Sequence, residues 1–314
     1  MTVRTAQRTA TVPVRARLVR IGTGKSWSQL DGGSGFACAL TTAGEPHCFG
    51  YAFNAQTGFA SDVWEPTRLQ GDNRFRAIYA GGTHSCGLDA VDSTAWCWGP
   101  SRHGQLGNVE WLWPELRYVP YQEVSRRPWA WLTVGGHGGT CGLDASDSLL
   151  YCWGHNDYAQ LGLPLRAHPP GFWQAEDITG PTRSFLGMEA LDASVGDIHG
   201  CMLTTEGETY CGSRANQANS GQDWLGKDPA DTGPLPWRVV GGHRFKAIGT
   251  GFASTCGLRE DGRVLCWGIS GLGALGAGEL PGAVRGMPAP VAVDVVFDRL
   301  RTGDYGGCAR SVAG

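Results

Sequence analysis

Apolar and polar positions along the chain alternate over short segments that are typical of β-strands. Phe245–Gly251 is a short apolar run that ends in glycines, and extended segments follow at Ala253–Leu258, at Arg263–Trp267 and, less distinctly, near Pro288–Val293. The turn after the first segment has two to four residues, which is too short for a parallel crossover. The four strands are therefore predicted to be antiparallel neighbours, and no helix of useful length is evident.

This four-strand pattern recurs six times. The first cysteines of successive units are 48, 55, 60, 55 and 52 residues apart, and a repeat of this length with several short strands indicates a propeller blade. The prediction is one all-β domain over residues 1–314, a β-propeller of about six (possibly seven) four-stranded antiparallel blades. The predicted units are 27–74, 75–128, 129–187, 188–244, 245–296 and 297–314, the last completed by residues 1–26. The alternating segment Thr11–Arg20 would supply outer strands to this last unit, so that N- and C-terminal strands together close the ring.

The cysteines give the sharpest local prediction. Ten of the eleven form pairs separated by 10 or 11 residues. If Cys256 lies opposite Cys266, Arg259 lies opposite Arg263, and the three-residue loop between them ends in glycine, as a G1 bulge requires. Opposed residues of antiparallel strands lie within disulfide reach. The predicted disulfides, against the alternative of buried reduced cysteines, are Cys38–Cys48, Cys86–Cys97, Cys141–Cys152, Cys201–Cys211 and Cys256–Cys266.

Cys308 has no partner because the last unit stops before its next strand, and it is predicted to be a free thiol. Disulfides form in oxidising compartments, so an extracellular or periplasmic location is expected if the pairs form. The first 22 residues contain arginines but no apolar core of a signal peptide. That observation conflicts with the expected location unless a leader has been removed.

Composition narrows the classes of partner. The chain has 26 basic and 29 acidic residues, a net charge of −3 and only three lysines, so a nucleic-acid partner is not expected. No apolar run approaches the length of a membrane span. Gly22–Ser26 lacks the first glycine of a phosphate-binding loop, and the cysteine spacing does not suit zinc. Neither a cofactor nor a metal is predicted.

Two units carry a glycine-rich turn, a histidine or glycine, the first cysteine, then Cys-Trp-Gly and a final Gln-Leu-Gly. The matching segments, with a looser version in the fifth unit, are Gly81–Leu88, Cys97–Gly99, Gly104–Gly107, Gly135–Leu143, Cys152–Asn156, Gln160–Gly162, Cys266–Gly268 and Ala274–Gly276. The pattern resembles the regulator of chromosome condensation repeat. The resemblance implies a β-propeller with four-stranded blades, seven in the best-known members. The paired cysteines resemble the bacterial and receptor-ectodomain variants of the repeat, whereas the basic surfaces of the chromatin-bound members have no counterpart in this acidic chain.

Length variation falls mostly between the third strand of each unit and the fourth. In an antiparallel blade these connections emerge on the same face as the turns after the first strand, so one mouth of the central channel should carry the insertions. Exposed loop tryptophans supply contact area at low entropic cost. The predicted binding residues are Trp111, Trp113, Trp173 and Trp224, with the alternative that they fold back over blade edges. Trp98, Trp153 and Trp267 follow the repeat and are predicted to be core residues.

The leading functional prediction is a non-catalytic binding propeller that recognises a protein or glycan (carbohydrate) through these tryptophan-rich loops. The likeness to extracellular bacterial propellers of this repeat supports a secreted role. The alternative is an enzyme, such as a hydrolase, lyase or cyclase, with its pocket at the channel mouth, where histidines and carboxylates could act as acid and base. In the competing interpretation the histidines belong to the repeat and bond a neighbouring backbone. The catalytic candidates are His84, His137, His199, Asp197, Asp304 and Tyr305.

Overall fold

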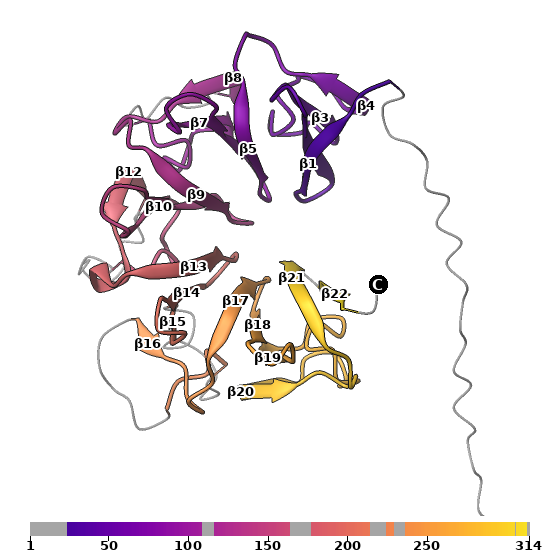
Figure 1. The fold of residues 1–314 in the computed structure, drawn as a ribbon, viewed down its shortest axis with the longest axis vertical. Coiled ribbons are helices and arrows are strands. Elements are labelled where there is room, and N and C mark those ends of the chain that lie inside the picture. Colours follow the sequence, from indigo (N-terminus) through magenta and orange to yellow (C-terminus); the bar gives the residue numbers. More distant parts are fainter. Residues whose placement is uncertain are drawn as a thin grey trace, which may run out of the picture.

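The computed structural model describes residues 24–108, 116–163, 177–213, 224–228, 236–304 and 306–312. Within these ranges, strands β1 to β22 form six antiparallel sheets arranged as blades around a central axis (Figure 1). In each blade the strand that comes first in the chain lies nearest the axis. A single-turn 3₁₀ helix, η1 (Phe185–Gly187), precedes the fourth blade. The described segments include no helix with the length and apolar character needed to cross a membrane.

The first three blades each contain four strands in chain order. Blade 1 comprises β1 (Trp27–Gly32), β2 (Phe36–Thr41), β3 (Pro46–Gly50) and β4 (Val63–Arg68). Blade 2 comprises β5 (Phe75–Ala80), β6 (Ser85–Asp89), β7 (Ala95–Pro100) and β8 (Leu116–Gln122). Blade 3 comprises β9 (Trp129–Val134), β10 (Gly139–Asp144), β11 (Leu150–Gly154) and β12 (Ile178–Arg183).

The remaining three blades follow the same order. Blade 4 comprises β13 (Ala190–Val195), β14 (Gly200–Thr204), β15 (Thr209–Gly212) and β16 (Trp237–Arg238). Blade 5 comprises β17 (Phe245–Thr250), β18 (Ser254–Arg259), β19 (Val264–Ile269) and β20 (Val284–Pro290). Blade 6 comprises β21 (Phe297–Gly303) and β22 (Gly306–Ser311).

The predicted all-β architecture of four-stranded antiparallel blades is confirmed. Blade 6 has two strands among the described residues, and Thr11–Arg20, the segment predicted to complete it, lies outside them. Blade 6 meets blade 1 where Ser34 Oγ donates a hydrogen bond to Asp304 Oδ2 at 2.9 Å. The two ends of the described ring are therefore neighbours in space.

The predicted hairpin register is present, and so are all five predicted disulfides. Cys256 pairs with Cys266 across β18 and β19, and Gly262 closes the three-residue loop with a φ of +80°. The paired cysteines have Cα atoms 4.0 to 4.1 Å apart, because they occupy the close type of cross-strand pair. Cys308 on β22 is a free, exposed thiol, as predicted.

Each disulfide closes a short loop, so its effect on stability is limited. Replacing both Cys256 and Cys266 with alanine should lower the free energy of unfolding by about 2–3 kcal/mol, the chain-entropy value for a loop of this length. Urea denaturation without reductant measures the change. Cys308→Ala is the matched control and should leave the unfolding free energy within about 0.5 kcal/mol of the original. Equal losses of unfolding free energy in the Cys256/Cys266 double variant and in Cys308→Ala would contradict the view that the disulfide stabilises the fold by restricting the unfolded chain.

The core lies between neighbouring blades. Trp98, Trp153 and Trp267 are fully buried, which confirms their predicted core role. The indole N–H of Trp153 donates to the Gln105 carbonyl of blade 2 at 3.0 Å, and that of Trp267 donates to the Leu225 carbonyl at 3.1 Å. Each of these two tryptophans therefore combines apolar burial with a satisfied polar group.

Glycine is needed where the turns after the inner strands crowd around the axis. A Cβ atom on Gly82 would overlap the Gly136 carbonyl oxygen of the next blade, and one on Gly251 would lie 2.7 Å from the Gly303 carbonyl oxygen. The backbones of adjacent blades thus approach too closely for any side chain. This close approach accounts for part of the chain's high glycine content.

Candidate functional site

A central channel of about 1010 Å³ runs between the inner strands of all six blades. The turns after these strands and the connections between third and fourth strands emerge at one end of it, because neighbouring strands are antiparallel. We call this end the loop face. Each functional candidate faces one of three places: the channel, the space between two blades, or the loop face.

The polar side chains of the inner strands mainly tie one blade to the next. The Gln29 amide accepts from Ile78 N at 2.9 Å and donates to Ile78 O at 2.6 Å. Asp31 accepts from Ala80 N at 2.9 Å, and Asp192 accepts from Ile248 N at 3.0 Å. Burial raises the pKa of Asp192 to about 6. These groups complete the backbone hydrogen bonds of the neighbouring inner strand, so the channel wall is chiefly structural.

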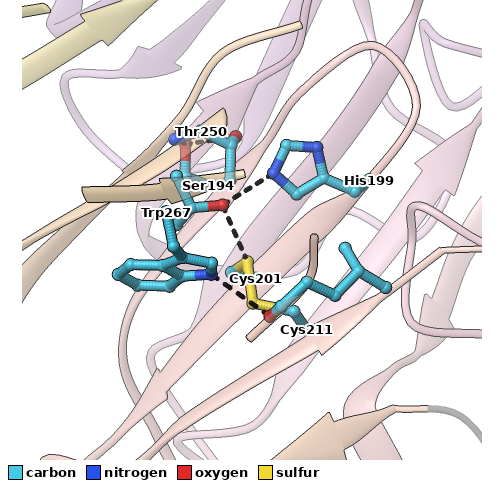
Figure 2. The surroundings of a disulfide bond; sticks show 8 residues. Ser194, His199, Cys201, Cys211, Thr250 and Trp267 are labelled. Atoms are coloured by element: carbon cyan, nitrogen blue, oxygen red, sulfur yellow. Dashed lines mark hydrogen bonds between the residues drawn. A yellow bond between two sulfur atoms is a disulfide. The ribbon is translucent and has the colours of Figure 1, made fainter. Parts of the chain in front are cut away.

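His84 and His199 do not converge on a common pocket. His84 Nε2 lies 2.6 Å from the Thr140 hydroxyl of blade 3, and His199 Nε2 lies 2.8 Å from the Thr255 hydroxyl of blade 5. Figure 2 shows His199 beside the Cys201–Cys211 disulfide, with its ring directed to the adjoining blade. Burial lowers the pKa of both imidazoles to about 3. Both histidines link blades through a threonine hydroxyl. At His199 a hydrogen bond with the backbone of Phe252 in blade 5 partly offsets the lowering of the pKa, in agreement with the expected bond to a neighbouring backbone.

The other mouth candidates do gather. A Cβ atom on Gly136 would overlap Asp197 Oδ1 and lie 3.2 Å from Asp304 Oδ1, so both carboxylates flank this glycine. Burial, and then the nearby charge of Asp304, raises the pKa of Asp197, while the charge of His137 lowers it. His137 is exposed on the same turn as Gly136. This group could share a proton or attract a cation at the mouth. Tyr305 lies outside the described residues.

Of the four predicted binding tryptophans, only Trp224 lies within the described residues, and the prediction that it is exposed is wrong. Trp224 is only 4% exposed; it packs in the core cluster between blades 4 and 5, with its ring edge-on to His199 at 5.1 Å. It follows the alternative in which loop tryptophans fold back over blade edges. Its apolar area is covered by the protein and offers no contact surface. Trp111, Trp113 and Trp173 lie outside the described residues.

An exposed aromatic group that the sequence did not single out lies on blade 1. Phe53 is 88% exposed, Trp64 is 70% exposed and Tyr51 is 56% exposed. The rings of Tyr51 and Trp64 meet edge-to-face at 5.6 Å, and Tyr51 lies against the turn at Gly35. We call these three residues the blade 1 aromatic patch. The sequence signal for this patch is a difference between units: at the equivalent positions the other units mostly carry smaller or polar residues.

A second unpredicted group joins blades 2 and 3 on the loop face. Ligand atoms of His103, His155 and Asp177 all lie within 4.8 Å of one another. The His103 and His155 rings are 4.7 Å apart between centroids, and His137 lies 5.8 Å from His155. Two imidazoles and a carboxylate at this spacing are a donor set that could hold a metal ion.

Comparison with known proteins agrees with this architecture. The sequence profile of the regulator of chromosome condensation (RCC1) repeat matches residues 245–274. The chain is 29% identical over 231 residues to the ultraviolet-B receptor UVR8 of Arabidopsis thaliana, covering 70% of this chain and 46% of the receptor. It is 26% identical over 279 residues to the mitochondrial RCC1 domain-containing protein RUG3 of the same plant, covering 84% and 58%. The chain thus spans about half the length of these relatives.

Solved structures show the same fold. Prp20p of Saccharomyces cerevisiae, described with its binding properties to Gsp1p and histones, superposes with a TM-score of 0.73 at 18% identity, covering 92% of this chain and 70% of that one. Human WBSCR16 superposes with a TM-score of 0.72 at 18% identity, covering 91% and 72%. Repeat motif, blade topology and these likenesses agree. The chain is a β-propeller that contains an RCC1 repeat at residues 245–274 and is similar to RCC1-repeat proteins over most of its length.

Proposed function

We propose that this propeller is a non-catalytic, protein-binding module whose partner docks on the loop face. The observation that carries the proposal is the blade 1 aromatic patch, in which three large side chains are exposed on one blade and two of them, Tyr51 and Trp64, are in ring contact. Large exposed apolar patches are rare on soluble proteins and usually mark interaction sites. Aromatic anchors held by a scaffold lose little entropy when they become buried.

The rigidity of the patch follows from its attachments. Ala52 N, between Tyr51 and Phe53, donates to Asp62 Oδ1 at 2.9 Å, and Tyr51 N donates to Gly35 O at 3.0 Å. Trp64 belongs to β4, which pairs with β3. The backbone that carries all three rings is therefore fixed before a partner arrives.

The similar structures support a protein rather than a small substrate as ligand. Prp20p is described as binding Gsp1p and histones, and yeast RCC1 (Prp20) is described bound to Kap60. The rival enzyme proposal loses support because His84 and His199 lie between blades and not at the channel mouth. Trp111, Trp113 and Trp173 remain proposed contacts on the same face. The five disulfides are consistent with an oxidising extracellular location, and we include secretion in the proposal.

The test is site-specific photo-crosslinking in native extracellular fluid. A photoreactive phenylalanine analogue at Phe53 should give a discrete crosslinked protein. The same analogue at Val91, which is 94% exposed on the turn between β6 and β7 at the opposite end of blade 2, should give none. Trp64→Ala should weaken binding of the captured partner by about 2 kcal/mol, or roughly 30-fold, as expected for an aromatic anchor.

The outcomes separate the alternatives. Crosslinking at Val91 but not at Phe53 would place the partner on the face opposite the loop face and would contradict the proposal. Capture that disappears after enzymatic deglycosylation of the fluid would identify a glycan as the ligand. Unchanged affinity of the Trp64→Ala variant would remove the aromatic patch from the interface.

A further inference from the structure

The group formed by His103, His155 and Asp177 has chemistry that the binding function does not use. His103 lies in the connection after β7 of blade 2, and His155 lies in the connection after β11 of blade 3. Asp177 comes directly before β12. His103 Nδ1 lies 3.1 Å from each carboxylate oxygen of Asp177, and that carboxylate is only 2% exposed.

Backbone contacts bring the three residues together. Gly154 pairs with Ile178 in the sheet, so His155 and Asp177 occupy the next opposed positions. Gly104, which adopts a φ of +69°, lies against the backbone of Ile178 and Thr179, and this contact places His103 over the end of β12. His155 N also donates to Gly138 O at 3.0 Å. The side chains therefore converge because of main-chain geometry, not because of flexible surface loops.

The two histidines are not part of the repeating scaffold. At the position of His155, units 1, 2 and 5 carry Tyr51, Pro100 and Ile269; at the position of His103, units 1, 3 and 5 carry Asn54, Tyr158 and Leu272. Asp177 does have a counterpart, Asp62, which accepts a backbone hydrogen bond from Ala52 in blade 1. The fold thus tolerates many residue types at these two repeat positions. Among the units compared, histidine occupies the position of His103 only in unit 2 and the position of His155 only in unit 3, and these two residues meet at the boundary between blades 2 and 3.

We propose that His103, His155 and Asp177 bind one divalent first-row transition-metal ion, with Zn²⁺ as the best fit, and that the ion joins blades 2 and 3 on the loop face. Ligand atoms 2.0–2.1 Å from a tetrahedral zinc ion are about 3.3 Å apart. The His103–Asp177 separation of 3.1 Å is already close to that value. The third ligand is within 4.8 Å and needs only a small side-chain movement.

The charges around the group favour a cation. Asp157 Oδ2 lies 3.1 Å from His155 Nε2 and supplies a second carboxylate as a possible fourth ligand. Arg102 Nε donates to His103 Nε2 at 3.1 Å. Ligation through Nδ1 would move the ring proton to Nε2, so metal binding requires this Arg102 contact to shift.

Metal binding has a specific cost at His155. The Gln160 amide nitrogen lies 3.0 Å from His155 Nδ1, and the Gln160 oxygen accepts from Tyr158 N at 2.9 Å. The ring proton is therefore on Nε2, facing Asp157. Ligation through Nε2 moves that proton to Nδ1 and requires the Gln160 amide to turn over.

The test is calorimetric titration of the metal-stripped chain with ZnCl₂ at pH 7.5. One Zn²⁺ per chain is expected, reversible by a chelator. His103→Asn and His155→Tyr, which install the residues found in unit 1, and Asp177→Asn should each weaken binding at least about 10-fold, the smallest loss seen when even an outer-shell partner is removed. His243→Asn, a half-buried histidine on the loop before β17, is the matched control and should bind as the unmodified chain does.

Near-ultraviolet circular dichroism checks that each variant is folded, so that lost binding reports the site. Absence of saturable binding to the unmodified chain up to millimolar Zn²⁺ would overturn the proposal. Unchanged affinity and stoichiometry in the His103→Asn/His155→Tyr double variant would also overturn it, by placing the ion elsewhere. Visible absorption of the Co²⁺-loaded chain provides a second readout: a strong band indicates four-coordinate geometry and supports the zinc assignment.

Discussion

Trp153→Ala should lower the free energy of unfolding by about 3–5 kcal/mol, the usual loss for a fully buried tryptophan. The side chain has no exposed surface, and its ring centroid lies 5.4 Å from that of Trp129. Its indole N–H reaches the Gln105 carbonyl at 3.0 Å, across the boundary between blades 2 and 3. The substitution opens a cavity at that boundary, and close-packed blades can fill it only in part.

Urea denaturation under non-reducing conditions measures this loss. Trp64→Ala is the matched control because it makes the same change at a position that is 70% exposed. It should alter the unfolding free energy by no more than about 0.5 kcal/mol, although it should weaken partner binding. Similar destabilisation by both substitutions would mean that burial between blades is not the main source of stability.

Acidification should destabilise the propeller through His84 and His199. Burial lowers the pKa of each to about 3 in the folded chain, whereas an unfolded histidine has a pKa of about 6.5. Between these values the unfolded chain binds two protons that the folded chain does not. Stability therefore falls as the pH drops from about 6.5 toward 3, by about 1.4 kcal/mol per pH unit for each histidine.

Asp192 opposes this trend over part of the range. Burial raises its pKa to about 6, so between about pH 6 and its unfolded pKa of 3.8 the folded chain holds a proton that the unfolded chain lacks. The net slope for the three groups is about 1.4 kcal/mol per pH unit between pH 6 and 4. Urea titrations at several pH values measure it. A His84→Gln/His199→Gln variant should lose the histidine contribution, and a slope equal to that of the original chain would contradict the assignment.

The repeat made most of the fold predictable. Cys256 and Cys266 are separated by a spacing that one hairpin register satisfies, and the same arithmetic applies to the other four units. Core tryptophans such as Trp153 were identifiable because the position recurs. Trp224 could not be identified as a core residue in this way, because it lies in an insertion that has no counterpart in the other units. The sequence pattern of an insertion does not indicate whether such a residue packs inward.

The candidate sites depend on contacts between blades, which a single repeat does not encode. His84 and His199 both lie two residues before a cysteine, and that position faces the next blade. His137 lies four residues before its cysteine, at the turn, and is exposed. The meeting of His103 with His155 requires the packing of one blade's connection against the next blade's outer strand. The spacing of these residues along the chain does not reveal how the blades pack together.

The short span of each disulfide has a consequence for how the protein matures. Ten cysteines could in principle combine in hundreds of ways, yet every native partner is 10 or 11 residues distant. A hairpin of that size forms in microseconds, so each correct pair can oxidise soon after its segment emerges during synthesis. Oxidative maturation can therefore proceed blade by blade, with little need for an isomerase to correct mispairing between distant segments.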